Sequence, residues 1–152
     1  MRHLQSVARN RHGQALVEFA LVLPLVLVLV ISVFEFARAW NIHQVITDAA
    51  REGARIAVVG SANDKDAATI QGEIEASVEN ALALAAVDPD DATITYNNLA
   101  AGRGEPATVG IAVPYSFLFL GPLMDLIGDF AGGGNGFDST ILLQTSFTMR
   151  NE

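Results

Sequence analysis

One apolar run dominates this chain. Between Glu18 and Glu35 lie sixteen uncharged residues, numbers 19–34. Taken as helix, the longer segment 15–40 holds 26 residues and measures about 39 Å at the usual helical rise. A bilayer core about 30 Å thick needs roughly 20 residues. The run is therefore long enough to cross a membrane once, with both of its ends at the interface.

Charge is distributed unevenly around this run. Residues 1–13 contain Arg2, Arg9 and Arg11 and no acid, which gives them a charge of +3. The remaining six basic and 17 acidic residues give residues 14–152 a net charge of −11. The positive-inside rule then predicts a cytoplasmic N-terminus and an exported body. The acidic body also argues against nucleic acid as a partner, because that partner requires a basic face.

The sequence offers little for catalysis or cofactor binding. It has no cysteine, two of its three histidines fall within residues 1–13, and His43 stands alone on a predicted helix. A metal cluster cannot be built from that set. "GGGNGFD" lacks the lysine of a phosphate-binding loop and is interpreted as a linker. "DPDD" at 88–91, and Asp129 with Asp138, are interpreted as acidic turns rather than calcium sites. We expect no enzyme activity, no metal, no other cofactor and no small-molecule substrate.

Helical periodicity continues past the apolar run. No proline interrupts residues 40–59, and small and apolar residues form one stripe there, which allows close packing on a partner. A continuous helix over residues 14–59 would be about 69 Å long, and Gly60 is expected to end it. A second amphipathic helix is predicted over residues 65–86. The stripe consists of Ile42, Val45, Ile46, Ala49, Ala50, Gly53 and Ala57.

The last third of the chain has the pattern of a small antiparallel sheet. Residues 92–99 alternate and are rich in β-formers, "AAGRGEP" reads as a hairpin loop, and odd positions are apolar over 109–119. Pro114 places that second strand at an edge or bends it. "GPLMDLIGDF" is predicted as a short helix or a packed loop, and 141–149 as the last strand. The fold class is therefore α+β, with a long transmembrane helix, a second helix and about three strands.

Glu18 needs an explanation, because it stands at the entrance of an apolar helix. An ordinary signal anchor explains it, since an acid is favourable near a helix N-terminus. A processing site also explains it, through the order of basic residues, Gly13, four residues, Glu18, the aromatic Phe19 and an apolar helix. A third reading is signal peptidase cleavage before Trp40, because "ARA" at 37–39 fits the small-x-small rule. The apolar core is longer than usual for a signal peptide.

Other residues mark the middle and the far end of the run. Glu35 and Arg38 are one helical turn apart and are interpreted as a local ion pair at the outer interface, with a contact between subunits as the alternative. Trp40 is interpreted as an interfacial aromatic anchor. Pro24 removes one helical hydrogen bond and is expected to shape the helix by a kink.

Several motifs in order carry a resemblance to a known family. "GQALVEFALVLPLVLVLV", then "FEFARAW" and "TDAAREGARIAVVG" resemble the TadE-like pilin proteins of the tight-adherence (Tad, Flp-type) pilus. The resemblance is continuous over residues 13–60. The C-terminal "TSFTMRNE" is similar more weakly, and residues 61–140 match by pattern only. The resemblance implies that a membrane-embedded aspartic prepilin peptidase cuts between Gly13 and Gln14, so that Glu18 becomes the fifth mature residue.

The resemblance also implies a role. The chain would be a minor pseudopilin or pilus-assembly protein of the bacterial cytoplasmic membrane or of the pilus itself. Residues 1–13 would be a cytoplasmic leader, 14–40 the single transmembrane helix, and 41–152 an extracytoplasmic pilin-like domain. Its partners would be membrane lipid, the prepilin peptidase, other pilins or pseudopilins and pilus-assembly membrane proteins. Assembly would proceed by packing of N-terminal helices.

In that role Glu18 acquires a physical purpose. Cleavage creates an α-amino group on Gln14 that is charged near neutral pH. A lone carboxylate is costly in lipid, so pairing with the amine of its own or a neighbouring chain would fix the register of assembly. The alternative function is a single-span envelope protein outside any pilus, which binds a partner through its apolar strand face and "PLMDLIGDF".

Overall fold

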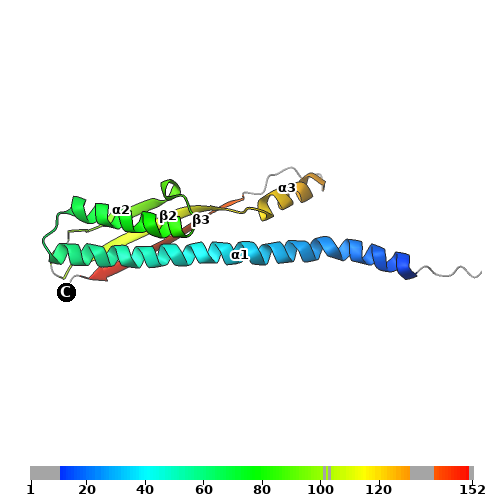
Figure 1. Cartoon of the computed structure of the whole chain (residues 1–152), viewed down its shortest axis with the longest axis horizontal. Helices are drawn as coiled ribbons and strands as arrows, with labels where there is room; N and C mark the ends of the chain where they lie inside the picture. Colours follow the sequence, from blue (N-terminus) through cyan, green and yellow to red (C-terminus); the bar gives the residue numbers. More distant parts are fainter. Residues whose placement is uncertain (1–10, 101, 103, 131–138, 151–152) are drawn as a thin grey trace, which may run out of the picture.

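A single long helix forms the spine of the molecule. The computed structural model describes residues 11–100, 102, 104–130 and 139–150. Helix α1, Arg11–Ala62, has 52 residues, or about 78 Å at 1.5 Å per residue. A small α+β body covers its C-terminal half, and its N-terminal half projects beyond that body (Figure 1). The predicted fold class is confirmed, and α1 continues without a break past Trp40.

The end of α1 differs from the sequence expectation. The helix runs two residues past Gly60 to Ala62, so the prediction that Gly60 ends it is wrong. Asp64 takes up the left-handed conformation at φ 56°, and the Lys65 N–H donates to the Gly60 carbonyl at 3.1 Å. This pattern closes a helix and satisfies its last carbonyls. Gly60 instead makes room, because a Cβ there would lie 2.6 Å from a side-chain carbon of Ile70.

Helix α2, Ala67–Leu84, turns back along α1. Its N-cap is Asp66, whose side chain accepts a hydrogen bond from the Thr69 N–H at 3.3 Å, which satisfies one of the unpaired amides of the first turn. The predicted helix over 65–86 is thus confirmed with slightly shorter ends. Its buried face, at helical spacing, consists of Ile70, Ile74, Val78 and Leu82.

Three antiparallel strands form the sheet, in the order β1-β2-β3. After the short 3₁₀ turn η1, Pro89–Asp91, come β1, Thr93–Asn97, and β2, Pro106–Ser116. Strand β3, Thr140–Arg150, follows α3 and pairs along the whole of β2. The three predicted strands are confirmed.

Strand β2, which holds Pro114, is the central strand of the sheet. Of the two alternatives that the sequence left open for Pro114, an edge position or a bend, the pairing shows a local edge. The pairing of β1 with β2 ends at Thr93 opposite Ala112. Pro114 therefore lies where β2 has only β3 beside it, opposite Leu142. One side of the strand is open there, which is where a residue without an N–H is tolerated.

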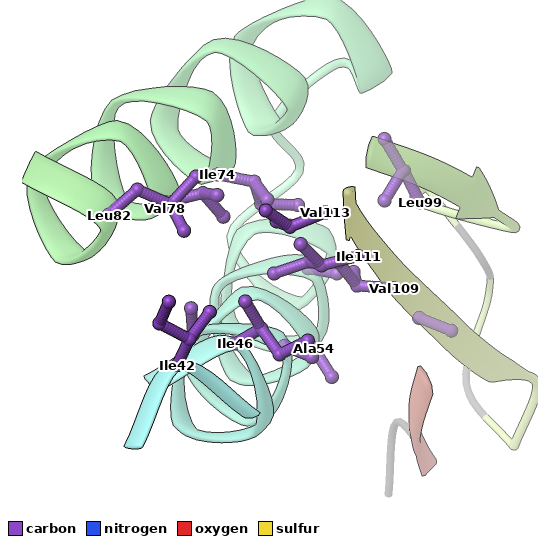
Figure 2. Packing of buried hydrophobic residues seen from close by; sticks show 14 of the residues in the cluster. Ile42, Ile46, Ala54, Ile74, Val78, Leu82, Leu99, Val109, Ile111 and Val113 are labelled. Carbon is purple, nitrogen blue, oxygen red and sulfur yellow. The ribbon is translucent and has the colours of Figure 1, made fainter. Parts of the chain in front are cut away.

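The core lies between the two helices and the sheet. Figure 2 shows side chains of α1, α2 and β2 meeting in one cluster. Gly53 of α1 permits the close approach, because a Cβ there would lie 3.1 Å from both Ile74 and Val109. The small-residue stripe of α1 thus packs on α2 and on the sheet of its own chain. The central side chains are Ile42, Ile46, Ala50, Ala54, Ile74, Val78, Leu82, Val109, Ile111 and Val113.

Helix α3, Leu120–Phe130, leaves the body beyond the end of β2 and lies beside α1, toward the projecting half (Figure 1). Its first turn is held close to the start of β3, because a Cβ on the buried Gly121 would lie 2.7 Å from the Ser139 Cβ. "GPLMDLIGDF" is thus a helix, one of the two possibilities that the sequence left open.

Candidate functional site

The N-terminal half of α1 is uncovered. None of its most apolar 18-residue stretch is buried by the rest of the chain, and the helix is long and apolar enough to cross a membrane. Leu21 and Leu25, for example, are 75% and 70% exposed. Such a surface of large apolar side chains is costly in water. The structure therefore agrees with a membrane anchor over this half, as the sequence predicts.

The predicted processing residues lie at the start of this exposed half. Because α1 begins at Arg11, the bond between Gly13 and Gln14 lies in its first turn. A Cβ at Gly13 would meet nothing within 4 Å. Glu18 and Phe19 follow on the exposed helix. Most of the predicted leader, residues 1–10, lies outside the described residues.

Within residues 11–100, 102, 104–130 and 139–150, Glu18 forms no salt bridge. Over the described residues, the salt bridges and hydrogen bonds do not involve its carboxylate. The predicted pairing with the α-amino group of Gln14 requires a cut chain and stays a prediction. Pro24 lies further along the exposed half of α1, and α1 is helical on both sides of it.

Glu35 is the one buried acidic residue in the described part of the chain, with 3% of it exposed. One carboxylate oxygen, Oε2, accepts a hydrogen bond from the Tyr115 hydroxyl at 2.7 Å, and the other, Oε1, accepts from the Phe119 N–H at 2.6 Å. The Tyr115 hydroxyl also lies 3.1 Å from the Glu35 carbonyl oxygen. Since Phe119 directly precedes α3, the carboxylate holds the beginning of that helix against α1.

The predicted ion pair between Glu35 and Arg38 is therefore wrong. Glu35 turns into the body, where its hydrogen-bond donors lie, whereas Arg38 remains exposed and its guanidinium carbon lies 5.3 Å from the Tyr115 ring centroid. A cation over an aromatic face is attracted by the ring quadrupole. Both charged side chains thus contact the same tyrosine instead of each other. Phe117 packs edge-on against that ring at 5.4 Å.

Burial raises the pKa of Tyr115 to about 12, and the hydrogen bond to the Glu35 carboxylate adds to this effect. The neutral phenol is the form that donates to a carboxylate, so the contact persists across the whole physiological pH range. Glu35 and Tyr115 together form a fixed joint between α1, β2 and α3. We call these two residues, with the Phe119 amide, the Glu35 joint.

Trp40 lies one turn beyond this joint on the exposed side of α1. Its ring stacks between Phe36 and His43, at 6.1 Å from each ring centroid, and it is 55% exposed. These residues line one wall of an apolar groove of about 450 Å³, with Leu120 and Ile141 opposite. Aromatic residues of this kind are enriched at membrane interfaces, and the role of Trp40 as an interfacial anchor stays a prediction.

The predicted acidic turns carry ordinary backbone contacts. The Asp88 side chain accepts from the Asp90 N–H at 3.1 Å and caps the short turn η1. Within the residues that the structure describes, no group of three or more His, Asp or Glu side chains has the arrangement of a metal site. Asp138 and the predicted linker at 132–138 fall outside the described residues.

Sequence reasoning missed Tyr115 and Phe119 as partners of Glu35. The alternation of the strand places Tyr115 only among its apolar odd positions. A buried tyrosine needs an acceptor for its hydroxyl, and a buried carboxylate needs donors. Those two requirements were a usable signal, although the 80 residues that separate Glu35 from Tyr115 hide it from any local pattern.

Comparison with known proteins supports the resemblance. The family described as TadE-like protein matches residues 13–55, which begins at the predicted cleavage glycine and covers most of α1. The family points to a protein associated with a Tad pilus. Neither the curated proteins nor the solved structures include a match to this chain. The resemblance seen in the sequence is confirmed: residues 13–55, the greater part of α1, are a TadE-like segment.

Proposed function

We propose that this chain is a minor pseudopilin or assembly protein of a tight-adherence pilus. The observation that carries the proposal is that the TadE-like segment, 13–55, joins two unlike halves of one helix. The first half is apolar and uncovered, whereas the second is packed into the chain's own body. A subunit built in this way leaves its membrane half available for lipid or for the helices of other subunits.

Processing would precede assembly. A prepilin peptidase would cut between Gly13 and Gln14, in the first turn of α1, where the helix has the fewest stabilising bonds. Gly13 favours unwinding of that turn, since glycine costs about 1 kcal/mol relative to alanine in a helix. The new α-amino group of Gln14 would then lie one turn from Glu18 and pair with it, or with the Glu18 of a neighbouring subunit, as helices pack together.

Signal peptidase cleavage before Trp40 is disfavoured by the Glu35 joint. That cut would remove Glu35 from the body and leave the Tyr115 hydroxyl and the Phe119 amide without their buried acceptor. It would also remove the buried Ala39. A body whose core includes residues from before the cut is poorly suited to release by that cut.

An envelope protein outside any pilus is the second candidate function. The apolar strand face that this alternative needs is buried against α1 and α2, so that part of the expectation is wrong. The region around α3 remains exposed, with Leu118 at 57% and Phe119 at 59%. This function would therefore depend on the α3 region alone.

The test combines three variants of the full chain, expressed with a prepilin peptidase and the remaining pilus components. Gly13→Leu should block maturation, because the peptidase reads a small residue before the cut. Glu18→Gln should leave cleavage intact but lower recovery in the pilus or assembly fraction. Gly72→Ala is the matched control, since a Cβ there meets nothing within 4 Å. Cleavage of the Gly13→Leu chain at the same bond, or normal assembly by Glu18→Gln, would count against the proposal.

A further inference from the structure

The body carries a second apolar surface, separate from its core. Five large apolar side chains, in the segment from the end of β2 to the first residues of β3, are exposed, although they belong to a folded domain. We call them the apolar foot. They are Leu118, Phe119, Met124, Ile141 and Leu142, which are 57%, 59%, 36%, 40% and 61% exposed. Exposed apolar side chains that gather at one end of a folded domain are candidates for a contact with protein or membrane.

The foot lies where α1 passes from its covered half to its uncovered half. On α1, the residues at this level are the exposed Phe36 and Trp40, and both line a groove with Ile141 of the foot. Figure 1 shows α3 reaching beyond the sheet toward the projecting half of α1. The apolar surface of the candidate membrane span therefore adjoins the foot at this groove, which is lined mostly by apolar side chains.

The sequence of α3 suits an interface between lipid and water. Helical spacing of 100° per residue puts Leu120, Leu123 and Met124 on one side, and Asp125 and Asp129 on the opposite side. Amphipathic helices of this kind lie with their apolar side in the headgroup region. Because the polar side is acidic, attachment would depend on apolar burial and would not require anionic lipid.

The Glu35 joint fixes the foot in place. The Phe119 amide bound by Glu35 belongs to a foot residue, and the same carboxylate is held by Tyr115 at the end of β2. A buried carboxylate is costly unless its hydrogen bonds are complete, so this contact tolerates little displacement of the foot along α1. Glu35 thus acts as a positioning residue that sets the height of the foot relative to the membrane span.

We propose that the apolar foot contacts the lipid leaflet from which α1 emerges, so that the body rests on the membrane as well as being tethered to it. A bilayer surrounds an emerging helix on every side and so reaches a foot that extends sideways from α1. A second copy of the chain would cover one side only. The proposal depends on the membrane span of α1 and is independent of the pilus role.

The chain has no cysteine, so single cysteines can carry spin labels in the full protein. Leu118→Cys and Leu142→Cys probe the foot, and Leu25→Cys probes the candidate span. Val59→Cys is the matched control, since it is also an exposed apolar residue, 46% exposed, but lies at the far end of α1. Each variant is reconstituted in phosphatidylcholine nanodiscs holding one chain. The collision rate of the spin label with oxygen, which concentrates in lipid, is then compared with its collision rate with a water-soluble nickel chelate.

The labels at positions 118 and 142 should collide preferentially with oxygen, and the label at position 25 should show a still stronger preference for oxygen. The label at position 59 should collide preferentially with the nickel chelate. If the label at position 25 lies in lipid but the labels at 118 and 142 lie in water, the contact of the foot with lipid is refuted, whereas the membrane span stands. A label at 25 in water would overturn both. If the labels at 118 and 142 are protected from both reagents, and nanodiscs loaded with two chains show spin–spin broadening, the foot contacts a second copy of the chain and the lipid contact is refuted.

A further variant separates positioning from simple loss of folding. Glu35→Gln keeps the shape of the side chain but removes its charge and one acceptor. In the Leu118→Cys background it should lower the collision with oxygen at the foot, while the label at position 25 stays unchanged. Unchanged oxygen contact at Leu118 with this variant would show that Glu35 does not set the height of the foot.

Discussion

Removal of the Glu35 carboxylate should destabilise the body far more than removal of other acids on α1. Each hydrogen bond to a charged group contributes about 1.5–3 kcal/mol, and Glu35 accepts two such bonds from other segments. Burial of the carboxylate costs several kcal/mol in the opposite direction. In Glu35→Ala the Phe119 amide loses its acceptor, at about 1–3 kcal/mol, whereas the Tyr115 hydroxyl retains the carbonyl of residue 35 at 3.1 Å.

The sum for Glu35→Ala is a loss of about 2–4 kcal/mol in the free energy of unfolding of the body. Glu35→Gln retains one acceptor oxygen and should lose about 1–2 kcal/mol. The matched control is Glu52→Ala on the same helix, which removes an exposed i,i+3 pair with Arg55. Exposed ion pairs contribute little, so this control should be close to the unmodified chain.

The assay is urea unfolding of the full chain in detergent micelles. Its signal is the fluorescence of Trp40, the single tryptophan, which lines the groove beside the joint. Amide hydrogen exchange at Phe119 supplies a local readout, and protection there should fall selectively in Glu35→Ala. The reasoning is refuted if Glu35→Ala unfolds at the same urea concentration as Glu52→Ala and Phe119 exchange is unchanged.

Two further predictions concern packing and titration. Gly60→Ala should lower the free energy of unfolding by about 1–3 kcal/mol by overpacking against α2, because its Cβ would lie 2.6 Å from a side-chain carbon there. Gly72→Ala, whose Cβ lies in open space, should instead stabilise α2 by about 0.5–1 kcal/mol. Equal effects of the two variants in thermal unfolding would contradict this difference in packing. With Tyr96→Phe leaving one tyrosine, ultraviolet titration should show Tyr115 ionising near a pKa of about 12, and lower with Glu35→Gln. Because the pKa of Tyr115 is raised in the folded state, the stability that Tyr115 contributes should hold below about pH 10 and decline as the pH rises through the folded-state pKa. Ionisation of Tyr115 near pH 10, both with Glu35 and with Gln at that position, would show that the hydroxyl is not buried.

The helices and strands were accessible to sequence reasoning because their patterns are local. The apolar run predicted α1, and residues at spacing 3–4 predicted the buried face of α2. Alternation at odd positions predicted that Val109, Ile111 and Val113 face one side of β2, and they are buried there. These signals depend only on period and on the length of each segment.

The errors concern contacts between distant segments. Gly60 reads as a helix terminator, but its role is set by Ile70 on the next helix. Glu35 and Arg38 read as an ion pair, because the sequence places them one turn apart. Which donors surround Glu35 depends on how β2 and α3 return to α1, and Tyr115 is 80 residues away. No local pattern encodes that return.

We propose that α1 becomes a membrane-embedded assembly helix after cleavage at Gly13. Mass spectrometry of the protein purified from envelopes of cells that contain a prepilin peptidase tests it most directly. The predicted N-terminal residue is Gln14 or its cyclised form, with Glu18 at the fifth position. A chain that begins at Met1 in those cells, or at Trp40, would contradict the claim.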